Sequence, residues 1–226
     1  MANPIDTEQE QVEYGSLASL SEDLVYRLPG CSDLMVRKTL QEVYRDFCSR
    51  SWCLSFTESG ETPEDGAYYI PRRIGSLSHV AEVSVGRRVL EQGRDWTLSR
   101  TPSPVVFLRL RPCRAFHQTH PRHPEVEEDC MRHGCRAERE RVRVKWVEIP
   151  GIGCERCPGW FLERHGDAIC HGVLAKLMSM TGRAWSDQAQ ASSELVQYEN
   201  AVNFANAEYY GGPISSPNAA MPLDLL

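Results

Sequence analysis

Apolar side chains recur every three or four residues between positions 33 and 51. They are Val36, Leu40, Val43, Tyr44 and Phe47. This spacing puts one buried stripe on a helix, and Ser32 or Asp33 is placed to cap its first turn. A shorter helix is predicted from Ser21 to just before the Leu28-Pro29-Gly30 breaker.

After Trp52 the apolar period changes from helical spacing to alternation, in short runs bounded by Gly, Pro or Ser. The predicted strands are 52–57, 67–71, 78–84, 88–91, 95–99, 104–111 and 142–149. In the last run, Val142, Val144 and Trp146 alternate with Arg143 and Lys145, which is typical of an antiparallel strand with one buried face. A 29-residue segment, 113–141, interrupts the last hairpin, and a connection of this length is generally functional or disordered.

Helical spacing returns at the C-terminal end of the chain. One helix is predicted over 159–181, although Gly166 and Gly172 within it each cost ~1 kcal/mol relative to Ala. A second helix, capped by Ser186 or Ser192, is predicted to end at Gly211-Gly212-Pro213.

Together these patterns predict an α+β fold: a helical bundle of N- and C-terminal helices, with an inserted small antiparallel β-sheet and extended terminal arms. The predicted parts are an N-terminal arm and helices (1–52), a β-rich insertion with a long hairpin loop (53–149), C-terminal helices (150–210) and a C-terminal tail (211–226). Residues 1–16 are expected to form the N-terminal arm.

Composition and charge narrow the class of protein. The chain has 226 residues, 41% hydrophobic and 25% charged, which is enough apolar material for a real core. No run approaches the ~20 apolar residues of a membrane helix, and the N-terminus lacks the features of a secretory signal, so we expect a soluble protein made in the cytosol. The net charge is −6, and all 25 basic residues lie between Arg27 and Arg183. Acidic ends of this kind suit contact with a protein partner more than phosphate binding.

Nine cysteines in a chain of this class favour metal binding or burial over a disulfide framework. The pairs Cys130-x4-Cys135 and Cys154-x2-Cys157 have spacing close to that of a zinc ribbon, so a structural zinc is a possible cofactor. An eight-residue strand between the pairs spans ~26 Å, so the pairs meet only if the 113–141 segment folds back along it. A site within that segment is the alternative. Its ligands would be Cys113, Cys130, Cys135 and one of His117, His120, His123 or His133.

Signals for catalysis are weak. The chain has no nucleophile elbow, no phosphate-binding loop and no HExxH zinc pair. His165 and Asp167 form a conceivable acid–base pair, but a packed helical histidine is the favoured interpretation. We therefore expect that the protein is not an enzyme.

Two stretches resemble a known family. The first runs from LPGCSD at 28–33 to RDFCSRSW at 45–52. The second begins at Pro150 and includes WFLERHGDAI at 160–169 and GVLAKLMSMTGRAWS at 172–186. Over 28–52 and 150–210 the chain resembles the head-to-tail adaptor (neck) proteins of tailed bacteriophages, similar to tail tubular protein A.

That resemblance implies a subunit made of an N-terminal helical part, a β-rich insertion and two C-terminal helices. It implies a virion neck protein, assembled in the host cytoplasm as a homo-oligomeric ring of twelve copies between the portal protein and a tail or nozzle protein. Genomic DNA would pass through the ring non-specifically, with no membrane involved. By the same analogy the C-terminal tail would dock on the portal through apolar anchors, namely Ile214, Met221, Leu223, Leu225 and Leu226.

Two other hypotheses remain open from the residues. A zinc-ribbon regulator that binds nucleic acid would use the cysteine pairs and the Arg-rich 113–141 segment. A hydrolase would use His165 and Asp167.

Overall fold

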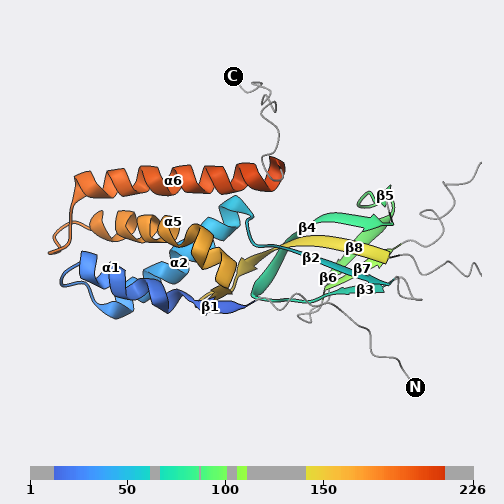
Figure 1. The fold of residues 1–226 in the computed structure, drawn as a ribbon, viewed down its shortest axis with the longest axis horizontal. Helices are drawn as coiled ribbons and strands as arrows, with labels where there is room; N and C mark the ends of the chain where they lie inside the picture. The colour runs from blue at the N-terminus through green and yellow to red at the C-terminus, as the bar shows by residue number, and fades with distance from the viewer. Residues whose placement is uncertain (1–12, 62–66, 87, 101–105, 111–140, 212–226) are drawn as a thin grey trace, which may run out of the picture. The chain divides into compact units, whose positions relative to one another are not determined.

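The computed structural model describes residues 13–61, 67–86, 88–100, 106–110 and 141–211 (Figure 1). Contacts divide this part of the chain into two compact units. Residues 55–148 contribute to a β-rich unit, and residues 13–54 and 149–211 contribute to a helical unit. Among the described residues, no helix combines the length and the apolar character needed to cross a bilayer.

The helical unit is built on α2 (Asp33–Ser51), α5 (Gly159–Met178) and α6 (Gln188–Gly211), with the short α1 (Ser21–Arg27) and the 3-10 turn η1 (Leu17–Leu20) before them. Helix α5 packs against both α2 and α6. The stripe predicted for 33–51 is confirmed, because all five of its apolar residues are buried in α2. Of the two predicted caps, Ser32 is the one used, and its hydroxyl accepts the Met35 amide at 3.3 Å.

The start of α6 differs from the prediction of a serine cap. Asp187 caps the helix, because its carboxylate accepts the Gln190 N–H at 2.9 Å. Ser186 instead closes the preceding loop, where its hydroxyl accepts the Arg183 N–H and donates to the Met180 carbonyl. A carboxylate near the first amides of a helix also interacts favourably with the helix dipole.

The β-rich unit contains two antiparallel sheets. One has the strand order β2-β8-β4-β5, from β2 (Ser55–Glu61), β8 (Arg141–Pro150), β4 (Gly75–Val85) and β5 (Arg88–Val89). The other has the order β3-β7-β6, from β3 (Ala67–Ile70), β7 (Val106–Leu110) and β6 (Trp96–Arg100). The alternation predicted for β8 is confirmed at Val142, Val144 and Trp146, which are fully buried.

A buried carboxylate holds one turn of this unit in place. Glu148 is fully buried, and its oxygens accept the backbone N–H groups of Arg73, Ile74 and Gly75 at 2.8–3.2 Å. The indole N–H of Trp146 donates to the same carboxylate at 3.0 Å. These four donors replace the water that the carboxylate loses on burial.

The prediction of a helical bundle with one small inserted sheet is wrong. The described residues form an α+β structure with three antiparallel sheets, and the third pairs β1 (Tyr14–Ser16) with β9 (Arg156–Pro158) inside the helical unit. Three residues of the predicted N-terminal arm are therefore a strand. Alternation along a chain indicates which face is buried but not which strand is the partner, so the number of sheets was misjudged. Residues 1–12 of that arm, the tail from 212 and the loop over 113–140 lie outside the described residues.

The three helices approach one another closely at Gly172 of α5. A Cβ atom built at Gly172 would lie 2.6 Å from Cγ1 of Val43 in α2 and 2.8 Å from the ring of Tyr198 in α6. Real Cβ atoms essentially never approach other atoms this closely. Gly172 thus allows α5 to contact two helices at one level, which offsets the cost of glycine within a helix.

We expect Gly172→Ala to lower the free energy of unfolding by about 1–3 kcal/mol, because the added methyl group overlaps both neighbours. Gly166→Ala in the same helix is the matched control. Its Cβ would meet its nearest neighbour, Leu20, at an ordinary 3.5 Å, so it should be neutral or stabilising by up to ~1 kcal/mol. Urea unfolding followed by circular dichroism measures both. Equal stability of the two variants would contradict the close approach.

Candidate functional site

The charges of α6 are few, and each is paired with an arginine. Its 24 residues include three charged side chains, all glutamates, and no Lys or Arg. Glu194 pairs with Arg27 at 2.9 Å, Glu199 pairs with Arg50, and Glu208 pairs with Arg164. Each ion pair joins α6 to another helix of the same unit, and Glu199, which is 40% exposed, makes its pair at the surface.

A strip of exposed residues along α6 carries no charged side chain. We call this surface the α6 outer face; its residues are Ser193, Val196, Gln197, Asn200, Asn203, Phe204, Ala207 and Tyr210. Val196, Phe204 and Tyr210 are 57%, 56% and 68% exposed. Exposed helix faces in soluble proteins are normally charged or polar, whereas the centres of protein interfaces are depleted in charge and enriched in aromatic residues. The α6 outer face therefore has the composition of a protein-binding surface.

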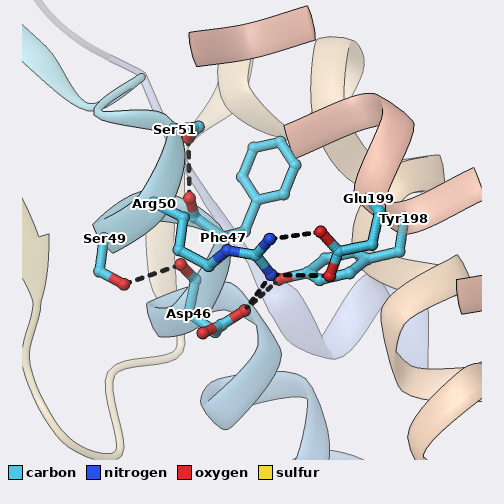
Figure 2. A network of polar contacts seen from close by, with 7 residues as sticks. All are labelled: Asp46, Phe47, Ser49, Arg50, Ser51, Tyr198 and Glu199. Carbon is cyan, nitrogen blue, oxygen red and sulfur yellow. Dashed lines mark hydrogen bonds and ion pairs between the residues drawn. The ribbon is translucent and has the colours of Figure 1, made fainter. Parts of the chain in front are cut away.

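A groove of about 730 Å³ lies beside this face, between α2, α5 and α6. Its charged lining residues are paired across the helices. Figure 2 shows Arg50 of α2 bound to Glu199 and Asp46, with the hydroxyl of Tyr198 donating to Asp46 at 2.8 Å. At the other end Lys176 binds Glu42 at 2.7 Å.

These contacts lower the pKa values of two carboxyl groups that line the groove. The hydrogen bond from Arg50 lowers the pKa of Glu199, and the hydrogen bond from Lys176 lowers the pKa of Glu42. Both groups are thus ionised at neutral pH and engaged by a cation. Paired, ionised carboxylates do not serve readily as proton donors or acceptors, so the groove has the character of a helix junction that fixes α6 in place.

The structure does not bring His165 and Asp167 together as an acid–base pair. His165 is buried on α5 with its ring 5.2 Å from the rings of both Phe47 and Phe161, whereas Asp167 is exposed. Residues two apart on a helix face different directions. Burial lowers the pKa of His165 to about 4, so the ring is neutral and packs as part of the core.

The cysteines predicted to bind zinc are only partly described. Cys130 and Cys135 lie outside the described residues, as do Cys113 and the four histidines of the alternative site. Cys154 lies in the turn before β9 and its thiol donates to the Arg156 carbonyl at 3.3 Å. Cys157 is buried on β9 and its thiol donates to the Gly15 carbonyl at 3.8 Å. In the part of the chain that the structure describes, no three His, Cys, Asp or Glu side chains are grouped to hold a metal ion.

Two further cysteines, Cys48 and Cys53, lie on either side of the end of α2. Cys48 is fully buried in the last turn of the helix. Cys53 lies two residues beyond the helix, and its N–H donates to the Ser51 hydroxyl at 3.4 Å. Their Cys48-x4-Cys53 spacing is the same as that of Cys130-x4-Cys135.

The predicted portal anchors Ile214, Met221, Leu223, Leu225 and Leu226 lie outside the described residues. No protein-family model matches the chain, and no curated protein matches it. Function is therefore inferred from the residues of this chain, above all from the α6 outer face.

Glu194 offers a pH-dependent test of how α6 is attached. Its side chain is only 5% exposed. Burial acts to raise its pKa, but hydrogen bonds from His171 and Gln190 and the charges of His171 and Arg27 outweigh burial, and the net pKa is lowered. A lowered folded-state pKa adds stability above the unfolded pKa of ~4.3, and this stability is lost as the pH falls through the folded value.

We expect Glu194→Gln to lower the free energy of unfolding by about 1–3 kcal/mol at pH 7, because Arg27 and His171 lose their anionic partner. The difference from the wild type should shrink as the pH falls below ~4.3, where the wild-type carboxyl also becomes neutral. Urea unfolding at several pH values measures it. Glu163→Gln, at an exposed position of α5, is the control and should change little at any pH. A pH-independent difference would show that the carboxylate charge does not hold α6.

Proposed function

We propose that the protein is a structural virion protein, a head-to-tail adaptor that assembles side by side into a ring between the portal and the tail of a bacteriophage. The observation that carries this proposal is the uncharged α6 outer face with its exposed Val196, Phe204 and Tyr210. Its work is binding rather than chemistry, and genomic DNA passes through the ring without sequence-specific contact.

The composition of the face favours a second copy of the same chain as its occupant. Copies with a net charge of −6 repel one another, so a contact between them is most favourable where neither contributes charge. A partner of opposite charge would instead call for a charged face. The 24 residues of α6 extend over ~36 Å, a length that allows an extended contact between neighbouring subunits.

The resemblance to adaptor proteins supports the same assignment. It covers 28–52 and 150–210, the stretches from which α2, α5 and α6 are formed. By analogy, we propose a ring of twelve copies in the virion neck, with the portal protein on one side and a tail or nozzle protein on the other. The apolar residues near the C-terminus are the proposed portal anchors.

We expect the wild-type protein to form a large ring in solution, alone or on addition of the portal protein encoded with it. Val196→Glu should weaken this assembly ~10-fold or more, because the new carboxylate would be buried unpaired in the contact. Light scattering over a concentration series, with and without portal, measures the mass.

Val89→Glu is the matched control, since Val89 is an equally exposed valine (60%) on β5 rather than α6. It should leave assembly unchanged. A wild-type monomer or dimer that ignores portal would overturn the proposal. If that species binds zinc stoichiometrically and duplex DNA in a salt-dependent way, the zinc-ribbon regulator becomes the better hypothesis.

A further inference from the structure

The turn between β8 and β9 carries an exposed apolar side chain at its tip. Ile152 is 94% exposed, more than any other large apolar residue that the structure describes. The Cys154 N–H donates to the Gly151 carbonyl at 3.1 Å, which closes a four-residue turn, and Gly153 has a φ of 74° within it. We call residues 151–154 the Ile152 turn. Turn positions are usually occupied by Gly, Pro, Asn, Asp or Ser, so the isoleucine is an unusual residue to present to solvent here.

The Ile152 turn is held on α2 at both of its ends. The guanidinium of Arg45 donates to the Pro150 carbonyl on one side of the turn. The side-chain amide of Gln41 donates to the Glu155 carboxylate at 3.0 Å on the other side. The position of Ile152 is therefore fixed by a helix, and burial of its side chain in a contact costs less conformational entropy than burial of a free loop would.

The Ile152 turn and the groove lie on different sides of α2 within the helical unit. Gln41 and Arg45 face the turn, whereas Asp46 and Arg50 line the groove and face α6 (Figure 2). At 3.6 residues per turn, the mean directions of these two pairs differ by about 140° around the helix axis. A closed ring needs a head-to-tail contact, in which each copy uses two different surfaces. When many copies close the ring, these surfaces face nearly opposite directions, as the turn and the groove do.

The lining of the groove suits an uncharged, apolar insert. Its apolar residues come from all three helices and include Val43, Ala175 and Leu195. Each of its charged side chains already has a partner within the groove, because Arg50 binds Asp46 and Glu199, and Lys176 binds Glu42.

The Ile152 turn has the matching character. The sequence from 149 to 154, IPGIGC, contains no charged residue. Such a segment enters the groove without breaking an ion pair and without burying a charge of its own. Leu195 of the groove is also next to Val196 of the α6 outer face, so one neighbouring copy is able to cover both surfaces.

We propose that the Ile152 turn of one copy inserts into the groove between α2, α5 and α6 of the next copy, beside the α6 outer face. This inference rests on the proposed function, because the ring supplies the second copy. It adds the two surfaces that form the contact between subunits. It also makes that contact head-to-tail, with Ile152 as the residue that fills the groove.

The position of residue 152 in the assembled protein tests the inference directly. The full-length Ile152→p-benzoylphenylalanine variant is prepared in unlabelled and isotope-labelled form, mixed in equal amounts, assembled alone or on the portal protein, and irradiated. We expect crosslinks between labelled and unlabelled copies that join position 152 to the groove, above all to residues 188–199 of α6. Mass spectrometry of the crosslinked peptides locates both ends.

Substitution of the same residue gives a second readout. Ile152→Glu should weaken assembly ~10-fold or more, because its carboxylate would be buried in a groove whose cations are already paired. Ile152→Leu keeps the apolar side chain and should assemble like the wild type. Val89→Glu adds the same charge elsewhere and should also leave assembly unchanged. Because Ile152 is so exposed, all of these variants should unfold in urea like the wild type.

The outcomes separate this inference from the proposed function. If the wild type assembles and Val196→Glu prevents it, but Ile152→Glu assembles normally, the inference is overturned and the ring remains. Crosslinks from position 152 to the portal, to the same turn of another copy, or to no other copy would overturn it in the same way. A wild type that does not assemble with or without portal would overturn both.

Discussion

The close approach of three helices at Gly172 is the constraint on which the helical unit depends. Without a side chain at this position, α5 contacts Val43 of α2 and Tyr198 of α6 at the same level. Tyr198 in turn reaches Asp46 on α2, and Arg50 extends from α2 to Glu199 (Figure 2). The close packing at Gly172 therefore accompanies polar contacts between Asp46 and Arg50 of α2 and the middle of α6.

The charges of α6 are used within its own unit. All three glutamates of the helix are used for contacts with Arg27, Arg50 and Arg164 inside the unit. The exposed side is left with amides, small residues and the apolar Val196, Phe204 and Tyr210. The glutamates that attach α6 to its own unit are thus absent from the α6 outer face, which is a surface suited to a partner.

Much of the fold was predictable wherever a periodic pattern extended over several turns or pairs of residues. The α2 stripe and the β8 alternation are examples, because each is repeated often enough to define a buried face. Strands β1 and β9 were not predictable, since three residues carry no usable period and their pairing joins Tyr14 to Pro158 across most of the chain. Likewise Gly172 was predicted to weaken its helix, because the sequence does not show that two other helices pack closely against this position.

The candidate sites also depend on contacts between residues that are far apart in the sequence. Spacing identified Cys154 and Cys157 as a pair but not their neighbours, because the carbonyl that the Cys157 thiol reaches belongs to Gly15, more than a hundred positions earlier. The left-handed turn at Trp52 is invisible in sequence, since nothing about tryptophan favours it. A costly conformation persists only where the surroundings stabilise it, and here the indole packs against two tyrosines. The strain at Trp52 is thus accounted for by what it joins: the end of α2 and the last turn of α6.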